Sequence, residues 1–174
     1  MDIYIVAQGC LRLKGKRSAF VVDPTVALKS KTAADAVIIL NEQEKYDLSK
    51  IEESRVTIKG PGEYEVSGTK ITAFRNAQNI VYSILIDGLS ILLGKTDAIE
   101  AAKEKLDKHN VLLIKVEGKL NEETIAALEP NVVIFYGDGA EEAVKALGKQ
   151  TSAVSKYSVT FEKLPEEMET VVLK

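Results

Sequence analysis

The stretch that decides the fold is NVLLIKVEGKLNEETIAALEPNVVIFYG, residues 110–137. An apolar run from Val111 to Val116 is typical of a buried strand, and a second such run covers Val132 to Tyr136. Between them Asn121 can cap a helix, and Pro130 is expected to end it. The spacing therefore predicts a β-α-β unit.

The sequence before this unit has a different pattern, in which short apolar runs alternate with turn residues. Ser67-Gly68 and Asp87-Gly88 each separate two strand-like runs, which is the pattern of a β-hairpin. Earlier strands are predicted at Ile3–Val6, Leu11–Leu13, Ala19–Val22 and Val37–Leu40. Hairpins followed by β-α-β units predict an α/β fold with mixed sheets, in a single domain over residues 1–174.

Two more helices are predicted in the second half of the chain. Thr96 or Asp97 can cap one of them, which is expected to run to about Lys108. The other is AEEAVKALG, residues 140–148, which Gly148 closes, and Asp138 is its expected N-cap.

Composition excludes several classes of protein. With 45% hydrophobic and 28% charged residues in 174 positions, the chain is expected to be globular, and its formal net charge of −3 disfavours nucleic acid as a partner. No apolar run approaches the roughly 20 residues of a membrane helix. A single cysteine, Cys10, rules out an intrachain disulfide and a four-cysteine zinc site. The start MDIYIVAQGC lacks the features of a signal peptide, so a cytoplasmic location is expected.

Several segments in order resemble the metallo-β-lactamase-fold hydrolases, in particular the small branch described as zinc-dependent and β-lactamase-like. The segments are GCLRLKGKRSAFVVDP (9–24), IKGPGEYEVSGTKITAF (58–74), NIVYSILIDGLSILLG (79–94), residues 110–137 and KLPEEMETVVL (163–173). The resemblance implies a four-layer αββα sandwich of two mixed sheets with helices outside both.

The resemblance also implies a metal site, which this sequence does not retain. Members of the family bind one or two zinc ions through His-x-His-x-Asp-His, after the strand that corresponds to Val37–Leu40, and through ligands after later strands. A cation, Lys95, stands here in place of the bridging carboxylate, and Tyr136-Gly137 stands where a histidine is usual. The positions of this vacated site are Asn41, Gln43, Lys45, Tyr46, Leu92, Lys95 and Gly137. We therefore expect no catalytic residue of the family, no metal and no cofactor.

Other residues leave alternatives open. Glu42, Glu44 and Asp47 could form a remodelled, oxygen-rich cleft, although a solvated charged loop explains them as well. Cys10 could act as a nucleophile but lacks a nearby base, so a buried core thiol is the favoured interpretation. His109, the only histidine, matches no ligand position and is expected to be structural or on the surface.

The favoured interpretation is a pseudoenzyme, a non-catalytic protein of this fold with a binding or scaffolding role. The alternative is a hydrolase with a remodelled active site, either metal-dependent or metal-independent. A homodimer or a complex with another protein is expected, and a partner chain could supply missing ligands.

Overall fold

The computed structural model describes residues 1–118, 121–149, 151 and 153–174. Both predicted hairpins are confirmed, and the backbone angles of their turn residues explain why they form. Ser67 and Gly68 have φ of 50° and 80°, and Asp87 and Gly88 have φ of 51° and 82°, the paired positive values of a tight type I′ turn. The strands that these turns join are β8 (Gly62–Val66), β9 (Thr69–Asn76), β10 (Asn79–Ile86) and β11 (Leu89–Lys95).

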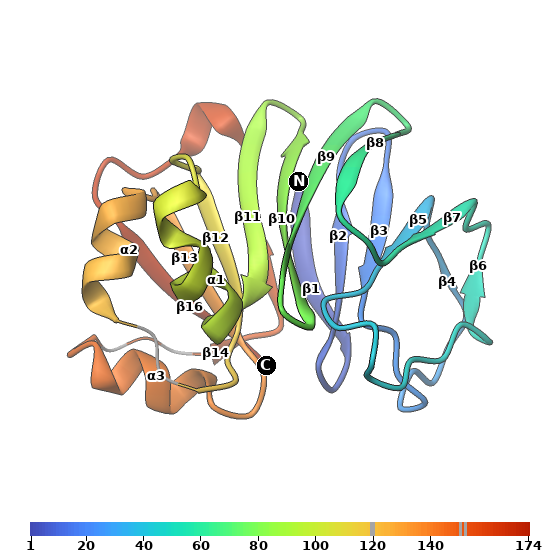
Figure 1. The fold of residues 1–174 in the computed structure, drawn as a ribbon, viewed down its shortest axis with the longest axis horizontal. Coiled ribbons are helices and arrows are strands. Elements are labelled where there is room, and N and C mark those ends of the chain that lie inside the picture. Colours follow the sequence, from blue (N-terminus) through green and yellow to red (C-terminus); the bar gives the residue numbers. More distant parts are fainter. Residues whose placement is uncertain (119–120, 150, 152) are drawn as a thin grey trace.

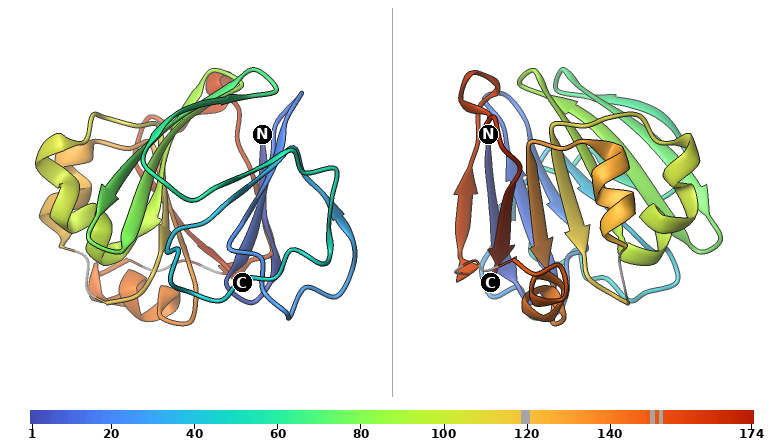
Figure 2. Two further views of the ribbon diagram at one scale, coloured as in Figure 1. Left: turned by 45° about the vertical axis from the view of Figure 1, so that its right-hand side comes forward. Right: turned by 90° about the vertical axis from the view of Figure 1, so that its left-hand side faces the viewer.

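The strands form two large mixed sheets that face each other (Figures 1 and 2). The first sheet has the order β15-β1-β2-β3-β5-β7 and the second has the order β14-β16-β13-β12-β11-β10-β9-β8. Strands of the first sheet are β1 (Asp2–Ala7), β2 (Cys10–Lys14), β3 (Ala19–Val22), β5 (Ala36–Ile38), β7 (Val56–Ile58) and β15 (Lys156–Ser158). The second sheet adds β12 (Val111–Lys115), β13 (Val132–Tyr136), β14 (Ala153–Val154) and β16 (Glu169–Leu173) to the two hairpins. The predicted division of strands between two sheets is confirmed.

The main core lies between the two sheets. Alternate residues of each strand turn inward, as the period of a strand requires, and build one large apolar cluster. Its largest fully buried members include Phe20, Tyr82 and Tyr136. This packing holds the ends of both sets of strands close together, and that proximity is what positions the candidate site.

The helices cover the outer face of the second sheet, and they are short (Figure 1). They are α1 (Thr96–Ala102), α2 (Glu122–Leu128) and α3 (Ala140–Ala146), with the 3-10 turns η1 (Lys103–Lys105) and η2 (Phe161–Lys163). The expectation that the first helix continues to Lys108 is wrong. The chain becomes extended at Leu106 and returns to the sheet, where His109 is buried and bonds Ser83. That tertiary contact overrides the helical pattern.

The outer face of the first sheet is covered differently. Cys10, Val21 and Ala34 form a small buried cluster there, under the segments that carry the short strands β4 (Thr32–Ala33) and β6 (Ile51–Glu52). The αββα sandwich is thus confirmed in its two sheets and one helical layer. In the described ranges, loops and the short β4–β6 pair take the place of the other helical layer.

Candidate ion-pair site at the strand ends

Three parallel strands of the second sheet end side by side. Lys95, Lys115 and Tyr136 are the last residues of β11, β12 and β13, and they pair in register as Lys95 with Lys115 and Lys115 with Tyr136. Residues in register on parallel strands point to the same face. The inward-facing Leu93, two residues before Lys95, shows that this face looks toward the first sheet. Two ammonium groups and a phenol therefore line one edge of the intersheet space.

The first sheet contributes a carboxylate to the same edge. Asp23 directly follows β3 and has a φ of 46°. Its Oδ1 accepts the Leu40 N–H at 2.8 Å, and its Oδ2 accepts a hydrogen bond from Lys115 Nζ at 2.9 Å. Asp23 thus ties the ends of two strands in the first sheet to a lysine of the second.

Two more carboxylates reach the lysines from loops. Glu117 Oε2 lies 2.8 Å from Lys95 Nζ, and its Oε1 lies 3.5 Å from Lys115 Nζ. Glu44 spans the same two groups, with Oε1 bonded to Lys95 and Oε2 at 3.7 Å from Lys115. We call Asp23, Glu44, Lys95, Lys115 and Glu117 the ion-pair cluster.

The cluster keeps Lys115 charged. Burial by itself lowers the pKa of Lys115, but Asp23, Glu44 and Glu117 together hold that pKa above its ordinary value. Burial raises the pKa of Asp23, against the opposing effects of Lys115 and of the Leu40 N–H. For Glu44, burial favours a higher pKa, yet the bonds to Lys95 and Lys115 leave it lowered. Within the cluster, each lysine thus lies next to carboxylates of opposite charge.

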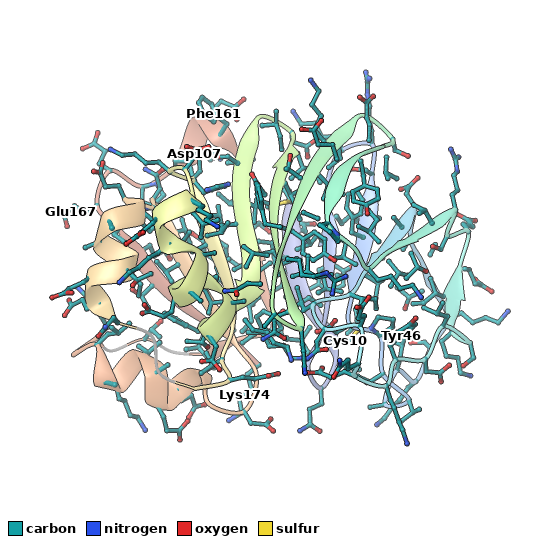
Figure 3. All side chains as sticks on the ribbon, viewed as in Figure 1. Cys10, Tyr46, Asp107, Phe161, Glu167 and Lys174 are labelled. Atoms are coloured by element: carbon teal, nitrogen blue, oxygen red, sulfur yellow. The ribbon has the colours of Figure 1, made fainter. Side chains whose placement is uncertain are left out.

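Two reactive groups beside the cluster are buried and protonated. Burial, followed by the charge of Asp23, raises the pKa of the Cys10 thiol to about 12. Cys10, labelled in Figure 3, is fully buried, in agreement with a core thiol. Tyr136 is also fully buried, and its Oη has no hydrogen-bond partner among the residues that the structure describes. Burial raises the pKa of this phenol well above its ordinary value, and the next cause is the charge of Asp23.

The structure separates the positions of the predicted vacated site. Lys95 is in the cluster, and Gly137 follows it at the end of β13, with a φ of 96°. Leu92 turns to the opposite face of the sheet and packs in the cluster under the helices. Gln43 and Lys45 lie exposed on the loop after β5.

The remaining positions on that loop also lie outside the cluster. Asn41 forms an isolated bridge with Asn79 of β10, and its Oδ1 accepts the Gln43 N–H at 2.9 Å. Tyr46, labelled in Figure 3, is partly buried. These residues shape the loop that delivers Glu44.

The acidic residues of the predicted remodelled cleft do not gather. Glu42 pairs with Arg75 at 2.8 Å, on the surface. Asp47 accepts the Ser49 N–H at 2.8 Å and thus closes a local turn. Only Glu44 turns to the lysines.

Sequence reasoning missed Asp23, Lys115 and Glu117 as site residues. A signal for Lys115 was available, because the ends of adjacent parallel strands share one edge. Lys115 lies near the end of the predicted strand Val111–Val116, and Lys95 directly follows the predicted strand run that ends at Gly94. No comparable signal exists for Asp23, which comes from the other sheet, 92 positions away from Lys115.

The zinc site implied by the resemblance does not fit these side chains. Structural and catalytic zinc sites use three or four histidine, cysteine or carboxylate ligands. Here each carboxylate at this edge is bonded to an ammonium group, and the thiol is protonated. Within the described ranges, no three His, Cys, Asp or Glu residues are grouped so as to hold a metal ion.

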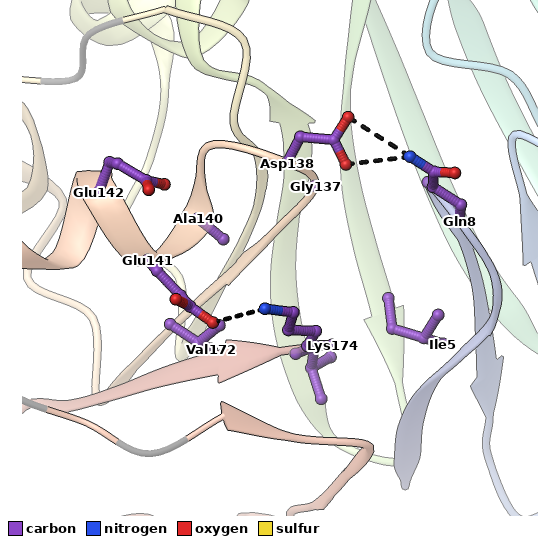
Figure 4. Close-up of a pocket in the computed structure, with 11 residues that line it drawn as sticks. Ile5, Gln8, Gly137, Asp138, Ala140, Glu141, Glu142, Val172 and Lys174 are labelled. Carbon is purple, nitrogen blue, oxygen red and sulfur yellow. Dashed lines mark hydrogen bonds and ion pairs between the residues drawn. The ribbon is translucent and has the colours of Figure 1, made fainter.

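A surface cavity of about 440 Å³ lies between β1, the start of α3 and the end of β16 (Figure 4). Gly9 and Gly137 line it, and a Cβ on either would lie 3.9 Å from the Lys115 side chain. Across the cavity, Asp138 accepts hydrogen bonds from Gln8 Nε2 at 3.2 and 3.4 Å. Asp138 therefore does not cap α3 as predicted, and the N-cap is Gly139, without a side chain to bond.

The sequence and the structure were compared with those of known proteins. No protein-family model and no curated protein matches the sequence. Among solved structures, a proposed Zn-dependent hydrolase of the metallo-β-lactamase superfamily from Thermotoga maritima is 23% identical, with a TM-score of 0.75 over 99% of this chain and 98% of that one.

Two more distant structures agree with this likeness. A proposed metal-dependent hydrolase from Parabacteroides distasonis is 15% identical, with a TM-score of 0.56 over 86% of this chain and 90% of its own. Zn²⁺-bound PqqB from Methylobacterium extorquens is 12% identical, with a TM-score of 0.56 over 91% of this chain and 100% of its own. Taken with the two facing mixed sheets, these likenesses identify the fold of the chain as that of the metallo-β-lactamase superfamily.

Proposed function

We propose that this protein is a non-catalytic protein of the metallo-β-lactamase fold that works without a metal and has a binding role. The observation that carries the proposal is the pair of ammonium groups, Lys95 and Lys115, at the ends of β11 and β12. The structural relatives are named as zinc- or metal-dependent hydrolases or as a zinc-bound protein, whereas this chain presents fixed cations among its carboxylates.

Electrostatics supports this reading. Two positive charges on a metal ion and one on an ammonium group 4 Å away repel by about 8 kcal/mol at an effective dielectric near 20. Lys95 is only 2% exposed, so its side chain is held at this edge rather than extended into solvent. Any metal at this edge would have to separate the carboxylates from the lysines that now neutralise them.

The alternative, a hydrolase with a remodelled active site, has less support. It would need a nucleophile or a general base close to the cluster. The Cys10 thiol is protonated far above neutral pH, and Glu42 and Asp47 bond elsewhere.

Metal analysis tests the proposal directly. Protein purified without chelator should carry less than stoichiometric zinc, and chelator should leave its melting temperature unchanged. Generic phosphodiester and lactam substrates should not be hydrolysed. Stoichiometric zinc in elemental analysis, lost on chelation together with a hydrolytic activity, would contradict the proposal.

Association and location remain predictions. None of the helices in the part of the chain that the structure describes has the length and apolar character needed to cross a bilayer. We still predict a homodimer or a protein partner, which light scattering and pull-down experiments check. A cytoplasmic location is likewise predicted, and cell fractionation tests it.

A further inference from the structure

We propose that Lys95 and Lys115 form the receptor for a small oxyanion, the carboxylate or phosphate group of a ligand, and that Glu44 occupies this place until the ligand displaces it. The inference rests on the proposed binding function and names its ligand chemistry.

The bridging geometry is the first argument. Both Glu44 and Glu117 use their two oxygens to contact both ammonium groups. The Lys95–Lys115 separation therefore suits an O–X–O unit, in which two oxygens share one central atom. Free carboxylates and phosphates contain the same unit, and lysine ammonium groups bind both as point charges.

Exposure distinguishes the receptor from its present occupants. The side chains of Lys95 and Lys115 are 3% and 13% exposed, whereas those of Glu44 and Glu117 are 43% and 44% exposed. The cations are thus fixed at strand ends, and the carboxylates reach them from the solvent side. Exchange of the Glu44 carboxylate for that of a ligand conserves the charge next to the lysines.

The backbones of the two glutamates differ in how firmly they are held, and this difference indicates that Glu44 is the one that a ligand displaces. Glu117 lies just after β12, and its N–H donates to Thr96 Oγ1 at 3.0 Å, so its backbone is fixed beside the cluster. Glu44 lies in an exposed run of the loop after β5, outside any helix or strand. Its side chain can swing outward without loss of a sheet hydrogen bond.

Tyr136 is an independent observation that indicates a ligand. Its Oη is fully buried and bonds no described residue, and its strand position is in register with Lys115. In register with Lys115, Tyr136 points to the inner face of the sheet, where the cluster lies. Burial raises its pKa most, and the nearby charges of Asp23, Glu117 and Glu44 add to that effect. A buried donor without a partner costs stability, and an oxygen of a bound anion would satisfy it.

Calorimetric titration tests the exchange. Inorganic phosphate and acetate are each titrated, at pH 7 and constant ionic strength, into the wild type, Glu44→Ala and Glu42→Ala. The Glu42 variant is the matched control, because it removes the same charge from the same loop but from a pair with Arg75. We expect Glu44→Ala to bind at least one of the two anions about tenfold more tightly than the wild type, and Glu42→Ala to match the wild type. The preferred anion identifies the ligand group.

Two further variants test the receptor. Lys95→Met, made together with Glu44→Ala, should weaken binding at least tenfold relative to Glu44→Ala. Tyr136→Phe in the same background should weaken it several-fold without lowering the melting temperature. Both effects would locate the anion at the cluster rather than at other surface lysines.

Two outcomes of the titrations would contradict the proposed anion site. If folded Glu44→Ala binds both anions no more tightly than about 10 mM, which is under about 3 kcal/mol of binding free energy, the inference is wrong. Equal affinities for Glu44→Ala and Glu42→Ala would overturn it too. All titrations contain a chelator. Stoichiometric zinc before chelation would contradict the metal-free function, whereas failure of the titrations overturns only the anion site.

Discussion

At the scale of single residues, two buried tyrosines differ in their hydrogen bonds. Tyr82 Oη donates to the carbonyl oxygens of Ile39 and Ile58, at 2.7 and 3.2 Å, and so links the second sheet to the first. Tyr136 Oη has no partner within the described ranges. Because both side chains are fully buried and differ in the bonding of the hydroxyl, removing each hydroxyl measures the contribution of its hydrogen bonds to stability.

We predict opposite outcomes for removal of the two hydroxyls. Tyr82→Phe leaves two buried carbonyls without this donor and should lower the free energy of unfolding by about 1–2 kcal/mol. Tyr136→Phe should leave it unchanged or raise it by up to about 1 kcal/mol. Urea denaturation of both variants checks the contrast, and equal losses would refute it.

His109 is structural, as expected, and it should make stability depend on pH. Its Nδ1 donates to the Asp107 carbonyl at 2.7 Å, so the neutral ring accepts the Ser83 hydroxyl at Nε2, also at 2.7 Å. Burial lowers the pKa of His109 below its ordinary 6.5, against the smaller opposing effects of the Asp107 carbonyl and carboxylate.

The sign of the effect follows from proton binding. Well above pH 6.5 the imidazole is neutral in both states and adds no penalty. As the pH falls below 6.5, the unfolded chain binds a proton that the folded protein resists, so the free energy of unfolding decreases until the pH reaches the folded pKa. His109→Gln should show a smaller decrease between roughly pH 7 and pH 5. Parallel profiles for the two proteins would rule out this role.

At the scale of elements, the close approach of α1 to the second sheet depends on a glycine. A Cβ at Gly94, in β11, would lie 3.1 Å from Ile99 Cγ1 of α1 and 3.3 Å from Val81 Cγ2 of β10. The turn from β11 directly into α1 leaves the helix little freedom to retreat. Gly94 is therefore a packing requirement of this strand-helix junction.

Gly94→Ala should overpack this junction and lower the free energy of unfolding by about 1–3 kcal/mol. Gly60→Ala is the control, because a Cβ there meets nothing closer than Tyr64 Oη at 3.8 Å. Thermal and urea denaturation compare the two. If both variants are as stable as the wild type, the contact between α1 and β11 is looser than the structure indicates.

At the scale of the whole molecule, the Lys115–Asp23 ion pair joins the two sheets at the edge where their strands end. Both side chains are largely buried, and their atoms are 2.9 Å apart. Loss of one partner from such a pair leaves an uncompensated charge, whereas replacement of both is often tolerated.

A double-mutant cycle measures this link. Lys115→Met should lower the free energy of unfolding by about 3–5 kcal/mol, and addition of Asp23→Asn should restore most of it. Asparagine tolerates the positive φ of position 23 and can still accept the Leu40 N–H. Lys174→Met, which breaks an exposed pair with Glu141, should leave the free energy of unfolding almost unchanged. A double variant as unstable as Lys115→Met would contradict the pairwise account.

The sequence by itself determined the local features of this protein. Turn residues such as Asp87-Gly88 specify a backbone conformation in two positions, and apolar runs such as Val132–Tyr136 specify buried strands, so both were predictable. The loss of the histidine motif is likewise readable, because ligand chemistry depends on residue type.

Only the tertiary structure decided which charges meet. Lys115 and Asp23 come from different sheets, and the packing of those sheets against each other brings them together. Glu44, but not Glu42 or Asp47, reaches the lysines because of the path of its loop. Such contacts depend on many distant residues at once and leave no periodic signal in the chain. The early end of α1 has the same cause, since the bond of His109 to Ser83 across the sheet overrides a local helical preference.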